Sequence, residues 1–477
     1  MPSDGVLIIG AGPAGLSAAD ELLRQGYENT IEIWEADPHY VGGISKTIEW
    51  EGYRFDIGGH RFFSKSDLIT QRWKSWLGPD LLERERLSRI YYRNRFFKYP
   101  LQPVNALINL GPMTAGHCVL SYAKRRFYPI RPEDSFADWV QNRFGRQLFD
   151  IFFRSYTEKV WGIPCEDIAA DWAAQRIKGL SLSTAVRAAL FGTPQGEIKT
   201  LIDRFYYPRL GPGMMWNRVA KKVQDEGALL HLDTSAGLLA HREGSVYMVQ
   251  GGQKLVRPKQ VISSMPLKHL LLGLRPLPPK QVIDAANALK YRDFMTVALV
   301  LDEPNLFPDN WIYIHDGTVN VGRIQNFGNW SPDLLGDPRT SCVGLEYFVN
   351  QSDEIWHASE SDLLKMASKE LLSLGLTKNA KIIKGTVIRQ PRAYPVYDKG
   401  YQQNRSIIQD YLKQFTNLQI IGRNGMHRYN NQDHAMMTGI LAAQNVMGAD
   451  WNLELVNSDA EYHEELSTER LTPQPLH

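Results

Sequence analysis

A glycine-rich turn near the N-terminus is the first group of residues whose spacing could support chemistry. Gly10-Ala-Gly12-Pro-Ala-Gly15 follows an apolar stretch at 5–9 and opens a segment at 13–25 with helical spacing. Gly10 permits a tight turn, Gly12 lets backbone approach a pyrophosphate, and Gly15 lets the helix pack closely on the strand. The N-terminus of such a helix presents free N–H groups and the positive end of its dipole to an anion. The spacing therefore predicts a phosphate-binding turn.

An acidic residue follows at the distance that a dinucleotide requires. Glu35 lies twenty residues after Gly15, at the end of a second predicted strand at 30–34. Its carboxylate can accept hydrogen bonds from both ribose hydroxyls of an adenosine and would repel a 2′-phosphate. Because strand, turn, helix and acid are all in place, the pattern favours a dinucleotide site in a Rossmann-like domain over a tight turn that binds no ligand.

Two further glycine pairs indicate an extended cofactor. Gly42-Gly43 follows Glu35, and Asp56-Ile-Gly58-Gly59-His60 comes next. A second pair lets backbone run along the flavin end of FAD, although two ordinary loop turns are the alternative. This ordering resembles the flavoprotein superfamily that includes amine oxidases, protoporphyrinogen oxidase and sugar-nucleotide mutases. The resemblance implies a second contact from a late segment, so the expected FAD contacts are Gly10, Gly12, Pro13, Ala14, Gly15, Glu35, Ala36, Gly42, Gly43, Ser45, Gly58, Gly59, His60, Arg423, Asn431 and Gln432.

Composition and charge argue against several kinds of partner. The 477 residues are 43% hydrophobic and 22% charged, the balance of a globular protein large enough for two or three domains. The net charge is +2, from 54 basic and 52 acidic side chains. This near balance of basic and acidic residues favours neither nucleic acid nor an anionic membrane as a partner, although local basic groups could still hold an anionic ligand.

The cysteines and the apolar stretches indicate the cellular compartment and whether the chain spans a membrane. Cys118, Cys165 and Cys342 are scattered and lack CxxC spacing, so we expect no disulfide framework, no zinc or other metal site, and a reducing, cytoplasmic location. The apolar start at 6–9 is too short for a signal sequence and lacks a basic leader. No apolar run reaches the roughly 18 residues of a membrane-spanning helix, so no membrane span is expected.

These motifs need a scaffold that brings distant segments together. We expect an α/β protein, α+β overall, in which a Rossmann-like FAD-binding domain carries a helical insertion and an antiparallel-sheet substrate domain. A late strand at 418–421 and a helix at 433–446 are predicted to return to the first domain. The expected boundaries are 1–64 with 205–265 and 415–450 for the FAD-binding domain, 65–200 for the mostly helical insertion, 266–414 for a mixed-sheet substrate domain and 451–477 for a C-terminal tail.

Six short blocks in order resemble UDP-galactopyranose mutase, and the eukaryotic type more than the bacterial type. The first is Gly58-Gly-His-Arg-Phe-Phe63, in which the resemblance places His60 against the flavin and Phe63 on the uracil. The second runs from Arg89 to Gln102 and matches the family's uridine-contacting segment. A structural histidine, and a surface strand with a turn, are the alternative interpretations of these two blocks.

The later blocks match the family's nucleotide cleft and diphosphate site. Tyr156-Thr-Glu-Lys-Val-Trp161 precedes Arg176, which stands fifteen residues after the tryptophan, where the family has a substrate-clamping arginine. The remaining blocks are Trp311-Ile-Tyr313 with Arg323 and Trp330, Arg392-Ala-Tyr394-Pro, and Gly422-Arg423 through His434. The resemblance implies that the substrate contacts are Phe63, Arg89, Tyr99, Gln102, Tyr156, Thr157, Trp161, Arg176, Tyr313, Arg323, Tyr394, Tyr429 and Asn431.

The resemblance also implies a reaction without net redox change. N5 of reduced FAD would attack the anomeric carbon of a UDP-sugar, and the sugar would exchange between pyranose and furanose forms before UDP returns. Arg176, Arg323 and His60 are the expected catalytic residues, and two arginines with tyrosine hydroxyls can hold a diphosphate without a metal. NADH and NADPH are candidate reductants, the partner is a small nucleotide sugar, and a homo-oligomer is left open.

Departures from the family pattern keep other functions open. Thr157 replaces a usual Asn, Ile202 aligns loosely with an Asn that touches the sugar, and Trp330 replaces a Tyr. Losing an amide at a sugar hydroxyl would change which pyranose is held. The alternatives are therefore a mutase-like enzyme acting on another nucleotide sugar, a flavin oxidase or desaturase, and a non-catalytic flavin-binding regulator.

Overall fold

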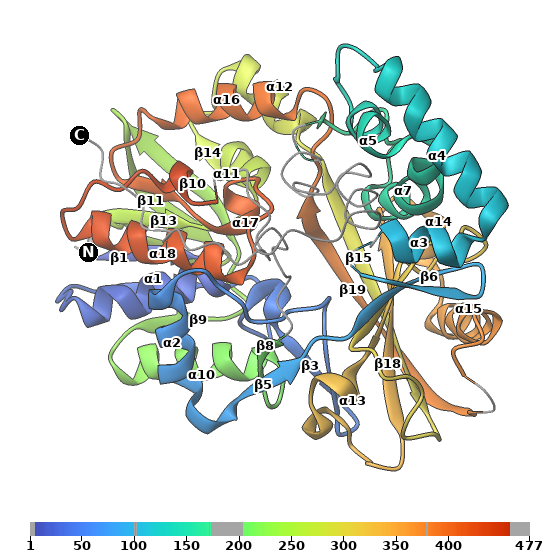
Figure 1. The fold of residues 1–477 in the computed structure, drawn as a ribbon. Coiled ribbons are helices and arrows are strands. Elements are labelled where there is room, and N and C mark those ends of the chain that lie inside the picture. Colours follow the sequence, from blue (N-terminus) through green and yellow to red (C-terminus); the bar gives the residue numbers. More distant parts are fainter. Residues whose placement is uncertain are drawn as a thin grey trace.

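The computed structural model describes residues 5–99, 101, 103–170, 172, 204–377 and 380–457. Figure 1 shows a half built on a parallel sheet, a second half built on a long, mostly antiparallel sheet, and a group of helices beside the second sheet. The predicted fold class is confirmed. Within the described ranges no helix is long and apolar enough to cross a bilayer.

The parallel sheet has five short strands, and the central one, Val6–Ile9, is apolar and buried at every position. Its strand order is β20-β13-β1-β2-β9, and each neighbouring pair is parallel. The predicted return of the late strand and helix is confirmed, because β20 closes one edge and α18 packs on α1. The elements are β1 (Val6–Ile9), α1 (Pro13–Arg24), β2 (Ile31–Trp34), α10 (Pro212–Asp225), β9 (Leu229–His231), β13 (Gln260–Ser263), β20 (Leu418–Ile420), α17 (Gly422–Gly425) and α18 (Gln432–Val446).

The other face of the parallel sheet is covered by a small four-stranded sheet and three helices. Leu7 and Ile9 of β1 lie in one core cluster with Leu267, Val282 and Ile408. Residues 267–288 and 401–412 therefore belong to this half, and not to the 266–414 substrate domain expected from sequence. The covering elements are β10 (Ala236–Arg242), β11 (Ser245–Gly251), β12 (Lys254–Val256), α11 (Leu267–Gly273), β14 (Leu274–Arg275), α12 (Lys280–Ala288) and α16 (Tyr401–Leu412).

The second half is a seven-stranded sheet of order β19-β15-β18-β17-β16-β6-β7. All its pairs are antiparallel except β16 with β6. Apolar side chains of one face pack against α15, whereas the other face looks toward the parallel-sheet half and the helices. The elements are β6 (Ser88–Tyr92), β7 (Arg95–Lys98), β15 (Tyr291–Leu301), β16 (Trp311–Ile314), β17 (Arg323–Asn326), α13 (Phe327–Trp330), β18 (Ser341–Val349), α14 (Glu354–His357), α15 (Glu360–Ser373) and β19 (Ile382–Pro395).

The helical insertion is shorter than the predicted 65–200, at least at its beginning. Residues 67–77 form α2, whose Trp73 and Leu77 pack into the core of the parallel-sheet half. Residues 88–98 form a hairpin of the substrate sheet, because Arg93 and Asn94 both take positive φ, 47° and 59°, and make a two-residue turn. The described helices are α2 (Asp67–Leu77), α3 (Pro103–Leu110), α4 (Pro112–Phe127), α5 (Phe136–Phe144), α6 (Arg146–Phe149) and α7 (Ser155–Trp161).

Two strand pairs lie where the halves adjoin. β3 (Thr47–Trp50) pairs with β4 (Tyr53–Asp56), and β5 (Leu81–Glu85) pairs with β8 (Arg204–Pro208). The Asp56 carboxylate at the end of β4 accepts a hydrogen bond from the Tyr207 hydroxyl at 2.5 Å and from the Thr47 hydroxyl at 3.0 Å. These bonds fix the chain two residues before Gly58-Gly59.

Close packing of α1 on α18 depends on glycines. A Cβ atom on Gly439 would lie 2.0 Å from the Ala14 carbonyl oxygen, and one on Gly15 would lie 1.9 Å from the Gly10 carbonyl oxygen. Helix α1 begins at the phosphate-binding turn, so its position on α18 also sets the position of that turn.

We predict that Gly439→Ala lowers the free energy of unfolding by about 1–3 kcal/mol, because the new methyl group forces the two helices apart. Gly116 in α4 is the matched control, since a Cβ there meets no atom within 4 Å. Gly116→Ala should raise stability by about 0.5–1 kcal/mol, because alanine has the higher helix propensity. Urea unfolding of both variants measures this, and equal stability of the two would contradict the packing argument.

Candidate active site

The predicted phosphate-binding turn is made of backbone from two loops. Gly10 has φ 100°, and its N–H donates to the Trp34 carbonyl at 2.7 Å. Gly42 N–H donates to the Ala11 carbonyl at 2.8 Å, which brings Gly43 against Gly12. A Cβ on Gly12 would find only Gly43 within 4 Å. The two glycine loops thus leave backbone without side chains at the N-terminus of α1, as a pyrophosphate requires.

Glu35 stands where an adenosine ribose would lie. Its carboxylate accepts hydrogen bonds from the Ala11 N–H at 2.7 Å and from the Asp37 N–H at 2.9 Å. Burial raises its pKa, and these backbone donors partly offset that effect. Of its neighbours in the prediction, Ala36 is exposed, whereas Ser45 is buried at the end of a short turn at Gly43–Ser45.

The N-terminus of α18 adjoins the same loops. Gln432 is buried, and its carbonyl oxygen accepts from the Trp216 indole N–H at 3.1 Å, while its amide nitrogen has no hydrogen-bond partner within the described residues. A Cβ on Gly42 would lie 3.0 Å from the Trp216 ring. The buried Gln432 amide thus lies beside the two glycine loops without a hydrogen-bond acceptor in the described part of the chain. Leaving such a donor unpaired costs free energy, so this arrangement fits a polar cofactor that would accept its hydrogen bond. Asn431 caps α18.

His60 connects the cofactor loops with a cluster of charged and aromatic residues. Its Nε2 lies 2.8 Å from the Ile57 carbonyl, and its ring is within hydrogen-bonding reach of the Ile44 backbone. Burial lowers its pKa to about 4, helped by the nearby guanidinium of Arg423. The imidazole is therefore neutral at physiological pH.

Arg323 is held by a carboxylate directly across the sheet. Arg323 on β17 and Glu346 on β18 are register partners, and Arg323 Nε donates to the Glu346 carboxylate. Gln325, two residues along β17, donates to the other oxygen of the same carboxylate. Glu346 is 1% exposed and Arg323 is 16% exposed, so the pair is almost removed from water. Burial raises the pKa of Glu346, and the bond from Arg323 offsets this only in part.

Gly58 lies where three predicted site residues meet. A Cβ there would be 3.5 Å from the Tyr394 hydroxyl, 3.7 Å from Arg323 Nη2 and 3.9 Å from His60 Nε2. Any side chain at Gly58 would enter this space, and its φ of 88° also favours glycine. The structure therefore brings together three residues from distant parts of the chain, of which His60 and Tyr394 are 334 positions apart.

Two tyrosines and the guanidinium of Arg423 lie beside this cluster. Tyr394 stacks on Tyr429 with ring centroids 5.6 Å apart. The Arg423 guanidinium lies over both rings and donates to the Asn430 carbonyl at 2.8 Å. Burial raises the pKa of Tyr394, so its hydroxyl stays protonated and can donate to an anion.

Helix α7 adds a third tyrosine and a tryptophan. Tyr156 lies against Tyr313 with centroids 5.5 Å apart, and Trp161 lies 6.2 Å from Tyr429. Tyr99 in turn lies 4.5 Å from Tyr313. Burial raises the pKa of Tyr156 well above its usual value, and the Arg323 guanidinium opposes that shift. The predicted tyrosines of five separate blocks thus lie in one cluster, in which Tyr156, Tyr313 and Tyr394 are near Arg323.

Helix α7 is tied to the substrate sheet by its own polar side chains. Ser155 donates to the His315 carbonyl at 2.8 Å, and Lys159 donates to the Asp316 carbonyl at 2.5 Å. Tyr156 stacks on the His315 ring at 4.7 Å with an interplanar angle of 6°. Arg292 binds the C-terminal carbonyls of the helix, at Lys159 and Val160. These contacts fix the ring of Tyr156 relative to Arg323.

Arg89 does not join this cluster, which corrects the prediction from sequence. Its guanidinium forms two hydrogen bonds with Asp309, at 2.8 and 2.6 Å, and lies 4.0 Å from the centre of the Phe96 ring. Side chains alternate across a strand, and Arg89 shares the face of Tyr91, which packs into the core under α15. The site is on the opposite face.

Three of the remaining predicted positions fall outside the described part of the chain, and three others are buried or half-buried. Arg176, Gln102 and Ile202 lie outside the described residues. Phe63 is half-buried and follows Phe62, which is buried against Trp73. Thr157 is buried on α7, and Trp330 is buried, donating its indole N–H to the Asn310 carbonyl.

Sequence reasoning missed the groups that support the site. Glu346 is the one charged residue in the mostly apolar strand β18, and a lone charge in such a strand indicates a buried, paired group. Arg61 and Arg86 both lie over the Trp311 ring, at 5.5 and 5.7 Å. Arg61 stands in the first quoted block but was given no role, and Arg86 lies outside all the blocks. Asp56 was seen only as part of a glycine motif, and burial raises its pKa to about 7.

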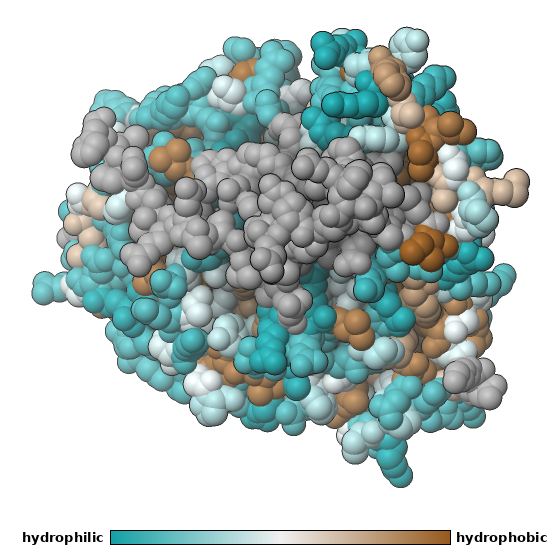
Figure 2. All heavy atoms as spheres, in the orientation of Figure 1, coloured by the Kyte–Doolittle hydropathy of each residue, from teal (hydrophilic) through white to brown (hydrophobic). Residues whose placement is uncertain are grey.

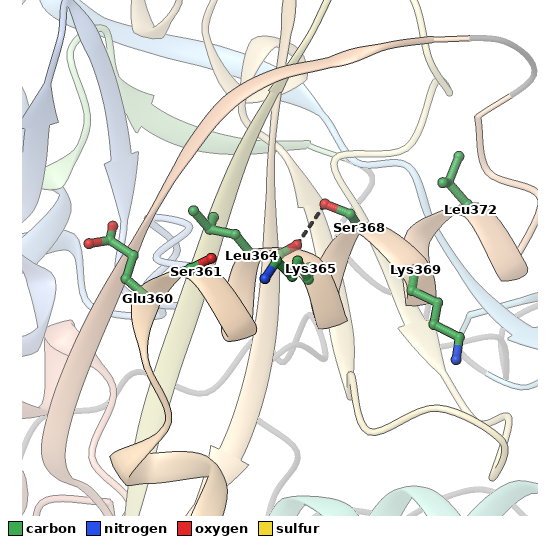
Figure 3. Close-up of a pocket in the computed structure, with 7 residues that line it drawn as sticks. All are labelled: Glu360, Ser361, Leu364, Lys365, Ser368, Lys369 and Leu372. Carbon is green, nitrogen blue, oxygen red and sulfur yellow. Dashed lines mark hydrogen bonds between the residues drawn. The ribbon is translucent and has the colours of Figure 1, made fainter.

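The described residues contain no group of three or more His, Cys, Asp or Glu side chains placed to hold a metal ion. A surface hollow lies along α15, and it is lined by Glu360, Ser361, Leu364, Lys365, Ser368, Lys369 and Leu372 (Figure 3). Because α15 covers the face of the sheet opposite to Arg323, this hollow is separate from the site.

Comparison with known proteins first identifies the nucleotide half. Residues 8–76 match the model of an NAD(P)-binding Rossmann-like domain. The chain is 40% identical over 81 residues to a zeta-carotene desaturase of Zea mays, and 45% identical over 56 residues to a 1-hydroxycarotenoid 3,4-desaturase of Flavobacterium sp. (strain P99-3). These stretches cover 17% and 12% of this chain, and only 14% and 11% of the two relatives.

Solved structures resemble the chain over nearly its whole length. Reduced UDP-galactopyranose mutase superposes with a TM-score of 0.82 at 22% identity, covering 94% of this chain and 96% of that structure. A putative protoporphyrinogen oxidase from Exiguobacterium sp. 255-15 gives 0.71 at 15% identity, covering 94% and 100%. Putrescine oxidase gives 0.60 at 16% identity, covering 94% and 99%. The predicted resemblance is thus confirmed at the level of the fold: the chain has the fold of UDP-galactopyranose mutase, built on a Rossmann-like dinucleotide-binding domain.

Proposed function

We propose that the chain is an FAD-dependent enzyme of the UDP-galactopyranose mutase kind, which interconverts the pyranose and furanose forms of a UDP-sugar without net redox change. The observation that carries this proposal is the Arg323 guanidinium, fixed by Glu346 and surrounded by tyrosine hydroxyls next to Gly58 and His60. A positive, hydroxyl-rich wall beside the predicted flavin end of a dinucleotide site suits a pyrophosphate leaving group.

The residues that would hold FAD fit an extended dinucleotide. The loops at Gly12 and Gly43 would bind the pyrophosphate, Glu35 the ribose, and the N-terminus of α18 with Gln432 the flavin end. When bound and reduced, FAD supplies a nucleophilic nitrogen for the anomeric carbon of the sugar. A neutral His60 would face the flavin without adding charge, because its pKa is about 4.

The chain's own residues would bind and activate the substrate. Arg323 would donate two hydrogen bonds to the diphosphate, which orients the sugar and stabilises the charge that develops on departing UDP. The hydroxyls of Tyr156, Tyr394 and Tyr429 would add neutral donors, so no metal is required. Arg176 is the proposed second cation, and NADH or NADPH the proposed source of electrons.

A flavin oxidoreductase is the second candidate, and the carotenoid desaturase matches favour it. An apolar hydrocarbon could not form hydrogen bonds with the Arg323 guanidinium. Burying Arg323 with Glu346 costs desolvation free energy, and a buried guanidinium at this place is useful only for a polar ligand. The two candidates differ in their products: a desaturase or oxidase changes the oxidation state of its substrate, whereas a mutase does not.

Dithionite-reduced holoenzyme incubated with UDP-galactose should form a furanose isomer, and the oxidised enzyme should not, because only the reduced cofactor is nucleophilic. Chromatography of the sugar nucleotides measures both reactions. Formation of an oxidised substrate with peroxide, on an amine or a polyene, would support the oxidoreductase instead. No isomer from UDP-galactose or from other UDP-hexoses would contradict the mutase proposal.

Arg323→Lys should reduce turnover by about 100-fold while the flavin remains bound, because lysine cannot form the paired hydrogen bonds of a guanidinium. Arg89→Lys is the matched control, since Arg89 makes the same kind of carboxylate pair on the opposite face of the sheet. It should keep most of the turnover. If both variants lose activity equally, the loss reflects stability and the role of Arg323 is wrong.

A further inference from the structure

The near-neutral total charge conceals an uneven distribution. Residues 86–132 contain no Asp or Glu but nine basic residues, Arg86, Arg89, Arg93, Arg95, Lys98, Lys124, Arg125, Arg126 and Arg131. The segment forms the β6–β7 hairpin and helices α3 and α4, which lie together along the right-hand edge in Figure 1. Arg95 of the hairpin donates to the Asn109 carbonyl at the end of α3, which joins the two parts.

Helix α4 turns large apolar side chains toward solvent. Met113, Leu120 and Phe127 recur every seven residues, so they share one face of the helix. Their exposed fractions are 80%, 69% and 78%, and that of Tyr128, directly after the helix, is 74%. Figure 2 shows hydrophobic residues interrupting the hydrophilic surface along this edge. So many neighbouring exposed apolar side chains indicate a binding surface.

Basic side chains accompany these apolar ones. Lys124 and Arg126 are exposed in the last turn of α4, and neither forms a salt bridge within the described residues. Arg93 and Arg95 are exposed at the hairpin turn and likewise form no salt bridge with a carboxylate of the described residues. We call the set of Met113, Leu120, Phe127, Tyr128, Lys124 and Arg126 the α4 face.

The combination of charge and exposed apolar surface selects the partner. A second copy of the chain would bring two positive surfaces together, which repel each other. A nucleic acid could pair its phosphates with the basic side chains, but it would leave the apolar side chains of Met113, Leu120 and Phe127 exposed to water. An anionic lipid surface satisfies both, because interfacial helices bury an apolar face at the acyl boundary while Lys and Arg meet the headgroups.

We propose that the α4 face binds the surface of an anionic phospholipid bilayer and lies in the interface without crossing it. Helix α4 has 16 residues, which suits a helix lying in the membrane plane. None of the side chains of the α4 face is among the residues placed around Arg323. This inference does not rest on the proposed function.

The holoenzyme should float with vesicles of phosphatidylglycerol and phosphatidylcholine but remain free with vesicles of phosphatidylcholine alone. The triple variant M113Q/L120Q/F127Q should bind at least about tenfold more weakly, and so should K124Q/R126Q. Added salt should weaken binding of the parent chain, because the attraction is partly electrostatic. Unchanged flavin absorbance and unfolding midpoint would show that the variants are folded, since all these side chains are exposed.

The matched control is Y247Q/L255Q, which removes two half-exposed apolar side chains from the β11–β12 hairpin. It should bind vesicles as the parent chain does. The proposal is overturned if the parent chain does not bind anionic vesicles, or if the α4 variants bind as well as the control. It is also overturned if light scattering shows a dimer without lipid that the triple variant converts to monomer, because the face would then hold a second copy.

Discussion

The buried pair of Arg323 and Glu346 is the interaction on which the rest of the site depends. Two charges removed from water lose several kcal/mol of hydration each, and their mutual attraction compensates only when the geometry is good. Here the two residues face each other across adjacent strands, and Gln325 satisfies the second carboxylate oxygen. The carboxylate therefore holds the guanidinium in one orientation, with an Nη2 group directed at the space beside Gly58.

Every other part of the fold can be understood as bringing something to that guanidinium. The parallel-sheet half brings the glycine loops and His60, and the bonds of Asp56 to Tyr207 and Thr47 hold the connecting strand. The helical insertion brings Tyr156 on α7, a helix fastened to the sheet by Ser155 and Lys159. Chain segments from the beginning, middle and end thus meet at one place, which explains why the matching motifs are short and widely separated.

Sequence alone predicted the elements whose signals are local. The glycine turn, Glu35 and the late strand with its helix followed from spacing, and the parallel sheet confirms the Rossmann-like prediction. The family resemblance also supplied Tyr156, Tyr313, Tyr394 and Tyr429, which the structure brings together.

The sequence alone could not show which residues far apart in the chain contact each other. Arg89 was expected in the site because its block matched, but the face of a strand that a residue occupies depends on register, and Asp309 lies 220 residues away. The hairpin at 88–98 falls within the range expected to be a mostly helical insertion, and Arg93 with Asn94 supplies the positive φ angles of its turn. The basic character of 86–132 is hidden in the total charge, and the structure shows that part of this segment accompanies the exposed apolar side chains of α4.

In the proposed reaction, the Arg323 guanidinium binds a diphosphate beside the flavin. A crystal structure of the protein with FAD and UDP tests it most directly. The account predicts that UDP lies with a phosphate oxygen in hydrogen-bond contact with Arg323 and with the hydroxyl of Tyr394, next to His60 and the flavin ring. UDP bound away from Arg323, or a flavin placed on the far side of the glycine loops from it, would contradict the account.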